Sequence, residues 1–387
     1  MRPVSNKWLS TLAKSHRVSC TVKVFWDRGT PDPYKYLLPV IGGSITFDAT
    51  AVGQRRATVV VPLKDGADDW DPRQSAEHPL SPFGSRLEIS LGVVHPDGTK
   101  EEVPQGLFQI SSSIVDPIAQ TVTVQTTDLI QRWIDCRTLN NPYDGWGPEF
   151  TYVGVLTLLS YPGLQPLPGV PRITDIDYSA MTNRPLGGPI EVIGAGNQDR
   201  MDLLAQLLNA WPAQAGIDDR GYLKVVPPIT KPKPLEDLVI TTNLPNSTAL
   251  SLITANQRRR VYNAVYVAGV NPATGNISVR ASAEVTSGPM NVNGPMGYLP
   301  RWFTSPLIHT QSQANAAAQN LLNKGVLDGL TSDVVCVPNP AIELYDTVLV
   351  NDQSHSPLLG LVTAIQIPLT ADGGPMQLSV TKSAPES

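Results

Sequence analysis

An alternation of apolar and polar residues most strongly constrains the first third of the chain. From Val18 to Trp26, every second residue is apolar or cysteine, and most of the residues between them are polar. This period of two is that of a strand with one buried face. Turn-forming residues separate further strand-like runs, which cover 57–61, 86–94, 106–115 and 121–126. Residues 16–126 therefore predict an all-β unit, either a small barrel or a sandwich.

Two of the segments between these runs contain residue pairs that are typical of turns. Asp97-Gly98 tolerates the positive φ that tight turns need, and Asp116-Pro117 separates the third and fourth runs. We expect a turn at the first and a hairpin at the second.

Three short helices are expected from apolar spacing. The first covers 5–14, with Ser5 as N-cap and with Trp8 and Leu12 on its apolar face. The others cover 127–135 and 198–210. A helix as short as the first is not stable alone and must dock on a neighbour. Trp8 and Leu12 are therefore candidate assembly contacts.

Strand-like patterns return in the last third of the chain. The expected strands cover 261–270, 276–284, 332–337, 345–350, 359–367 and 376–381. One helix interrupts them at 312–324, and its apolar stripe consists mainly of alanines, which indicates close packing. Gly325 follows it, at a position where a C-terminal cap glycine is common.

Proline and glycine mark the expected boundaries. Proline accounts for 36 of 387 residues, and 15 of the 50 residues in 141–190 are Pro or Gly, so no long element is expected there. A proline-rich linker at 227–234 marks another boundary. The expected division is an N-terminal arm at 1–15, a first β-barrel at 16–135, a connecting region at 136–189, a small α+β insert at 190–239 and a second β-barrel at 240–387.

Charge and hydropathy exclude several classes of protein. Lys and Arg number 29 against 34 Asp and Glu, a net charge of −5, which does not suit a nucleic-acid-binding groove. No apolar stretch is long enough for a membrane-spanning helix, and the N-terminus lacks the apolar core of a secretory signal. We therefore expect a soluble protein that folds in a cytoplasm. Three widely spaced cysteines do not form a disulfide framework.

Motifs for catalysis, cofactors and metals are incomplete. The segment 194–199 has Asp199 where a dinucleotide fingerprint needs its third glycine, so a helix cap is favoured. The segment 42–46 lacks the closing glycine of a nucleophile elbow. Four aspartates lie in 65–71, but without the spacing and the closing glutamate of a calcium loop, which favours a solvated loop. We expect no catalytic, cofactor-binding or metal-binding residue, and no cofactor.

Two arginine clusters each precede an expected strand. Gln54-Arg55-Arg56 is echoed by a glutamine and three arginines at 257–260, a hint of two related β domains. Five arginines are too few for nucleic-acid binding in a chain of this charge. Arg258, Arg259 and Arg260 are therefore interpreted as a strand flank or as assembly contacts between subunits.

A series of stretches resembles the tail hub proteins of long-tailed bacteriophages, of the actinobacterial-phage type. It includes PVSNKWLSTLAKSHRVSCTVKVFWD, GGSITFDATAVGQRRATVVV, PLSPFGSRLEISLGV, MDLLAQLLNAWPAQAG, RRRVYNAVYVAG, SQANAAAQNLLNK and NPAIELYDTVLV. The resemblance covers nearly the whole chain except residues 141–188. It rests on the order and spacing of many weak features.

The resemblance implies a structural virion protein, a baseplate hub or tail-tip minor tail protein. Such hubs are homotrimers with two tail-tube-like β-barrels per chain, so that six barrels match the sixfold tail tube to the threefold tip. Its expected partners are distal tail and tail-tube proteins, the tape measure protein, and tail fibres or spikes, with DNA only passing through. It would be assembled in the host cytoplasm and lie at the tail tip. Since the last strand ends just before Ser387, no appended enzyme is expected.

Two alternatives remain open from the sequence alone. A receptor- or glycan-binding β-sandwich would share the β regions and would use exposed aromatic residues such as Trp146, Tyr152 and Tyr161. A cell-wall hydrolase would need two convergent carboxylates or a zinc site in a cleft. Ring symmetry would distinguish the hub from both.

Overall fold

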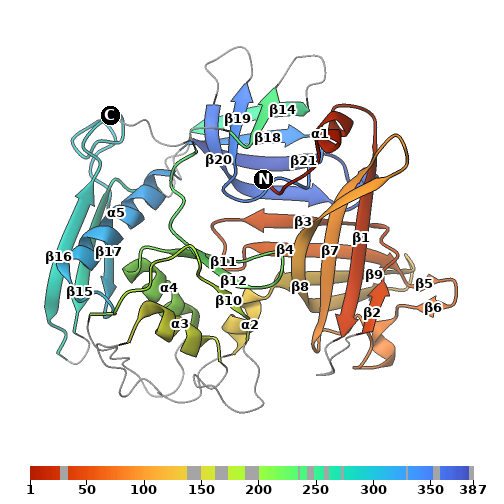
Figure 1. Ribbon diagram of the computed structural model, residues 1–387, viewed down its shortest axis with the longest axis horizontal. Coiled ribbons are helices and arrows are strands. Elements are labelled where there is room, and N and C mark those ends of the chain that lie inside the picture. The colour runs from red at the N-terminus through yellow and green to blue at the C-terminus, as the bar shows by residue number, and fades with distance from the viewer. Residues whose placement is uncertain are drawn as a thin grey trace.

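The computed structural model describes most of the chain (Figure 1). The described residues are 1–26, 34–136, 150–161, 173–187, 200–233, 236–241, 248–256, 261–271, 274–327, 330–351 and 358–382. The helices are α1 (Asn6–Leu12), α2 (Ile130–Asp135), α3 (Tyr152–Leu159), α4 (Arg200–Ala210) and α5 (Gln311–Leu327), with 3-10 turns η1 (Pro72–Gln74) and η2 (Ala371–Gly373). The strands of the first half are β1 (Arg17–Trp26), β2 (Tyr34–Leu37), β3 (Gly42–Asp48), β4 (Arg55–Pro62), β5 (Lys64–Asp65), β6 (Asp68–Asp69), β7 (Ser85–Val94), β8 (Lys100–Asp116), β9 (Thr121–Asp128) and β10 (Ile176–Asp177). Those of the second half are β11 (Gln214–Ile217), β12 (Leu223–Val226), β13 (Leu238–Thr241), β14 (Ala249–Asn256), β15 (Ala264–Val270), β16 (Ile277–Glu284), β17 (Pro300–Ser305), β18 (Leu330–Cys336), β19 (Thr347–Asn351), β20 (Leu358–Pro368) and β21 (Met376–Lys382).

Most of the described strands belong to one sheet, in which 13 of them are paired. Its main path is β14-β18-β21-β20-β3-β4-β9-β8-β7-β1-β2. A side branch leaves this path at β20, which also pairs with β19, and β19 in turn pairs with β13. The two β regions meet where β3 pairs antiparallel with β20, from Asp48 opposite Ala364 to Ser44 opposite Pro368. The expected mainly β fold is confirmed. The two regions are not two separate closed barrels, however, because this pairing makes them one open sheet among the described strands.

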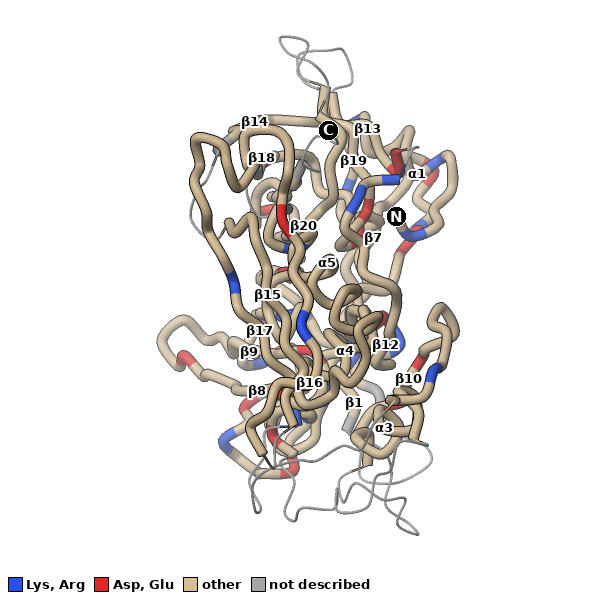
Figure 2. Tube along the Cα trace, turned by 90° about the vertical axis from the view of Figure 1, so that its left-hand side faces the viewer, with Lys and Arg blue, Asp and Glu red and all other residues tan. Residues whose placement is uncertain are grey.

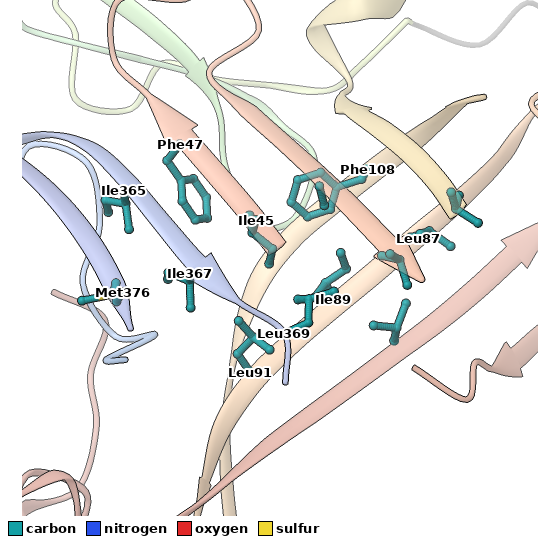
Figure 3. Packing of buried hydrophobic residues seen from close by; sticks show 14 of the residues in the cluster. Ile45, Phe47, Leu87, Ile89, Leu91, Phe108, Ile365, Ile367, Leu369 and Met376 are labelled. Carbon is teal, nitrogen blue, oxygen red and sulfur yellow. The ribbon is translucent and has the colours of Figure 1, made fainter. Parts of the chain in front are cut away.

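Side chains from both β regions fill one core (Figure 3). The apolar face of β3, which the first region supplies, packs among side chains of β20 and β21 from the second. Buried members of this cluster include Ile45, Phe47, Leu87, Ile89, Leu91, Phe108, Ile365, Ile367, Leu369 and Met376. Shared burial therefore holds the two regions together in addition to the strand pairing.

The turns predicted from sequence form as hairpins. In the β8–β9 turn, a carboxylate oxygen of Asp116 accepts hydrogen bonds from the amides of Ile118 and Ala119, at 2.9 and 3.0 Å. In the β7–β8 turn, Gly98 has a φ of 82° and its amide donates to the carbonyl of His95. Side chains of Asp and the flexibility of Gly thus determine both reversals.

A second core lies beside the large sheet, at the left of Figure 1. It contains α2, α3, α4 and α5, the small sheet β10-β12-β11, and one face of the sheet β16-β15-β17. Strands of the region 240–387 therefore divide between two sheets. The similar arginine clusters do not precede equivalent strands, since β4 lies in the large sheet and β15 in the sheet β16-β15-β17. The domain boundaries given above stay predictions.

Two local expectations differ from the structure, and one short helix was not anticipated. The helix expected at 127–135 begins only at Ile130, because Thr127 and Asp128 still belong to β9. Helix α3 forms inside the Pro/Gly-rich region, where a hydroxyl of Thr151 caps it by accepting from the amide of Gly154. Gly325 is not a C-cap, because α5 continues to Leu327.

Charged side chains are sparse and of mixed sign along the described trace. Lys and Arg lie among Asp and Glu in Figure 2 and do not form a continuous basic stripe there. In the part of the chain that the structure describes, no helix has the length and apolar character needed to cross a membrane.

Candidate assembly surfaces

The main path of the large sheet ends in two edge strands, and β13, which pairs only with β19 among the described strands, is a third edge strand on the side branch. Among the described strands, β14 pairs only with β18, and β2 pairs only with β1. Both edges present large apolar side chains to solvent: Leu250 and Ile253 of β14 are 64 and 62 % exposed, and Leu37 of β2 is 66 % exposed. Unpaired edges with exposed apolar side chains are competent to pair with another chain.

Helix α1 docks on the chain's own sheet. Trp8 is fully buried and Leu12 nearly so, in a small cluster with Val93, Val103 and Ala341. The indole Nε1 of Trp8 also donates to Oδ1 of Asn339 at 3.1 Å. The short helix is therefore stabilised by neighbouring elements of its own chain. A contact of Trp8 and Leu12 with another subunit stays a prediction.

Polar contacts extend this docking along the N-terminal segment. The amide and hydroxyl of Ser5 donate to the two carboxylate oxygens of Glu101, at 2.8 and 2.6 Å. The guanidinium of Arg2 donates to the carbonyls of Pro340 and Ile342, at 3.0 and 3.2 Å. Residues 2–12, which we call the N-terminal strap, thus tie β8 of the first region to residues 339–342 of the second.

Asp128 forms a buried polar junction between β4 and α2. One of its carboxylate oxygens accepts from the amide of Arg55, and the other accepts from the amide of Ile130, both at 3.1 Å. Burial raises the pKa of Asp128 to about 6, because removal from water disfavours the charged carboxylate, and the two amides oppose this only partly.

A crevice of about 350 Å³ lies between the large sheet and β11–β12. It is lined by equal numbers of cationic and anionic side chains: Arg2, Arg55, Arg220 and Lys224 with Asp177, Asp218, Asp219 and Glu343. Among these residues, Arg2 and Glu343 form an ion pair at 3.4 Å.

The acidic loop at 65–71 includes the small hairpin β5–β6. Asp69 accepts hydrogen bonds from the amide of Asp71 and from Gln74, and these lower the pKa of its carboxyl group. Arg73 pairs with Asp71, at 2.7 Å, and lowers its pKa to about 2. These oxygens are thus engaged by donors of their own loop. Among the described residues, no three His, Cys, Asp or Glu side chains are grouped to hold a metal ion.

The other predicted site residues have different outcomes. Arg258, Arg259 and Arg260 lie outside the described residues, as does Trp146. Tyr152 was expected to be exposed, which is wrong: it is 2 % exposed, and its ring stacks on Trp211 with centroids 5.4 Å apart. The first residue of α3 faces the second core, which explains its burial.

An exposed aromatic cluster was not anticipated. Trp302, 73 % exposed, stacks on Tyr266 with ring centroids 4.5 Å apart. The hydroxyls of Tyr266 and Tyr298 both donate to Oε1 of Glu284 at 3.1 Å. Register places Tyr266 opposite Trp302 across β15 and β17. Only this strand pairing brings the two rings together, so the sequence around either residue did not predict the cluster.

Comparisons with known proteins identify the fold. No protein-family model matches the sequence, and neither does any curated protein. Among solved structures, the tail protein from Neisseria meningitidis MC58 matches with a TM-score of 0.63 and 12 % identity, covering 95 % of this chain and 96 % of that one. The prophage MuSo2 43 kDa tail protein from Shewanella oneidensis matches with a TM-score of 0.58 and 13 % identity, over 95 % and 99 % of the two chains. The prophage tail protein gp18 from Listeria monocytogenes EGD-e matches with a TM-score of 0.54 and 11 % identity, over 94 % of each. The chain therefore has the fold of these phage tail proteins over nearly its whole length.

Proposed function

We propose that this protein is a structural virion protein that forms a trimeric ring at the distal end of a phage tail. In this role it adapts the sixfold tail tube to the threefold tip and forms part of the channel for DNA and the tape measure protein. The fold shared with three phage tail proteins supports a role in the tail. The resemblance in sequence to tail hubs supports the position at the tip.

The observation that carries the ring is the open sheet, whose main path ends in the apolar edge strands β14 and β2. An edge such as β14 of one copy can pair with a different edge, β2, of the next copy. This contact is heterologous, so it repeats around an axis and closes into a ring where the rotation allows. Leu37, Leu250 and Ile253 would then be buried between subunits.

The charge of the chain suits a conduit. A net charge of −5 and the interspersed charges of Figure 2 provide no basic groove to retain DNA by counterion release. We propose distal tail proteins, the tape measure protein, and fibres or spikes as partners, and we propose no catalytic role.

The test is the mass and rotational symmetry of the purified protein, by light scattering and averaged electron micrographs. One chain has a mass of 41.7 kDa, and we expect three times this mass and threefold symmetry around an open channel. The variant Ile253→Lys should yield monomers. Ile277→Lys, which places the same charge on an exposed position of β16 outside the large sheet, should leave the ring intact. A wild-type monomer, or equal effects of both variants, would contradict the proposal.

Glycan binding is the second candidate, and the cluster of Trp302, Tyr266 and Tyr298 favours it. The exposed face of an aromatic ring attracts the C–H groups of a sugar, and Glu284 offers an acceptor beside the rings. Binding of host cell-wall glycans by the wild type and not by Trp302→Ala would support this candidate over the ring.

A further inference from the structure

A groove of about 550 Å³ separates the β3–β4 turn from helices α4 and α5. Its walls are mainly apolar, with Leu208, Ala213 and Leu321 among the lining residues. Side-chain hydroxyls and amides, including those of Thr50 and Asn209, interrupt these walls. Two cations also line it, and we call it the Arg301–Lys324 groove.

Arg301 is held in place by a stack of side chains. A Cβ atom at Gly325 would lie 2.3 Å from the ring of Tyr262, so the ring rests directly on the backbone of α5. The guanidinium of Arg301 lies over the same ring, 5.0 Å from its centroid, and donates to the Tyr262 hydroxyl at 3.1 Å. That hydroxyl in turn donates to the carbonyl of Leu321 at 2.7 Å. The cation is thus oriented before any ligand arrives.

Lys324 adds a second positive charge to the same groove. It lies one residue before Gly325 on α5 and is half-buried. Burial, and secondarily the charge of Arg301, lower its pKa. Lys324 forms no hydrogen bond or ion pair with any described residue, and the lining of the groove contains no Asp or Glu. Two cations share this space without a carboxylate.

We propose that the Arg301–Lys324 groove binds a segment of a partner protein in which an Asp or Glu side chain lies between apolar residues. A carboxylate would compensate both cations, and a guanidinium can bind it through two parallel hydrogen bonds. The volume lies within the range of ligand-binding sites, whose walls are mostly apolar with a few oriented polar groups.

The rim of the groove favours a peptide over a small anion. Val52 and Ile229 line it and remain 61 and 37 % exposed, so apolar surface extends outward from the cations. Apolar side chains that flank the carboxylate would cover this surface. The polar side chains on the walls, such as Thr230 and Gln214, can bond the main chain of an extended segment.

The test uses three labelled peptides: acetyl-Ala-Leu-Glu-Leu-Ala-amide and the same peptide with Gln or Lys at the centre. Binding to the full chain is measured by fluorescence anisotropy. We expect saturable binding of the Glu peptide, at least tenfold weaker binding of the Gln peptide, and none of the Lys peptide. Lys324→Met should weaken the Glu peptide at least tenfold and leave the Gln peptide unchanged. Equal affinity for the Glu and Gln peptides would overturn the proposal.

A control variant, a stability measurement and a competitor test whether the effect is specific to the groove. Lys14→Met removes an exposed lysine just after α1, outside the groove, and should leave binding of the Glu peptide unchanged. The melting temperature of Lys324→Met should equal that of the wild type or exceed it, since the replaced ammonium pairs with none of the described residues. If glutarate displaces the peptide at the peptide's own concentration, the groove is a site for small anions and the proposal of a protein segment is wrong.

Discussion

Replacement of Trp8 by alanine tests whether the N-terminal strap stabilises the sheet. The indole is fully buried against Leu12, Val93, Val103 and Ala341. A buried tryptophan removes about 150–250 Å² from water, which at about 25 cal/mol per Å² gives roughly 4–6 kcal/mol. Measured Trp→Ala costs in protein cores are about 3–5 kcal/mol. We therefore expect Trp8→Ala to destabilise the strap by about 3–5 kcal/mol.

The more conservative variant Trp8→Phe separates packing from hydrogen bonding. Phenylalanine keeps most of the apolar contact and loses the bond from Nε1 to Asn339. Oδ1 of Asn339 still accepts from the amide of Ala341, at 3.2 Å, so no buried acceptor is left without a donor. We expect a loss of about 1 kcal/mol from the hydrogen bond.

Hydrogen exchange measured by mass spectrometry shows which segments are destabilised in Trp8→Ala. In Trp8→Ala, amides of residues 85–103 and 337–346 should exchange faster, whereas those of α4 in the second core should not change. Urea unfolding gives the accompanying free energy. Unchanged exchange at both segments, with a loss below 1 kcal/mol, would refute the argument. If Trp8→Ala and Leu12→Ala also leave the mass of the assembled particle unchanged, the two residues are not needed for assembly.

Three further substitutions have effects with a defined sign. The pKa of Asp128 is about 6 in the folded protein and about 4 in the unfolded chain. The protonated carboxyl group therefore stabilises the folded state at low pH, and about 3 kcal/mol of this stability is lost as the pH rises from 4 to 6. Urea titrations should show this loss in the wild type relative to Asp128→Asn, and parallel pH profiles would contradict it. Gly325→Ala should lower the melting temperature, because displacing the ring of Tyr262 costs about 1–3 kcal/mol, more than the gain in helix propensity; an unchanged or higher value would show that the ring moves freely. Ser5→Ala should cost about 1 kcal/mol in urea unfolding through loss of the α1 cap, and no loss would mean that Glu101 alone positions this turn.

Local structure was predictable from sequence where neighbouring residues decide it. The alternation at 18–26, the Asp and Gly turns, and the Ser5 cap all depend on residues a few positions apart, and all are present. Helix α3 was missed because prolines and glycines around it masked a short apolar segment that burial in the second core stabilises.

Features that depend on distant residues could not be predicted. Strand β3 begins with Gly42-Gly43, a pair that is typical of loops. In the structure, a Cβ atom at Gly43 would lie 2.0 Å from the carbonyl oxygen of Thr58, so the close approach of β4 requires glycine there. Gly325 was predicted to be a helix cap because its contact with Tyr262, which lies more than sixty residues away in the sequence, could not be predicted. The Arg301–Lys324 groove likewise forms only where the β3–β4 turn, β17, α4 and α5 come together.

If copies of this chain associate through β14 and β2, as we propose, the continuity of the large sheet constrains the geometry of the assembly. Because β3 pairs with β20, the edges β14 and β2 belong to one sheet and cannot rotate independently. Adjacent strands differ in direction by roughly 20–25°, and this twist accumulates along the whole path between the two edges. Joining β14 of one copy to β2 of the next therefore adds a fixed rotation at each step and does not extend a flat sheet. Substitutions that loosen the β3–β20 pairing should consequently broaden the distribution of particle symmetries before they abolish folding, and electron micrographs of such variants would show a mixture of ring sizes.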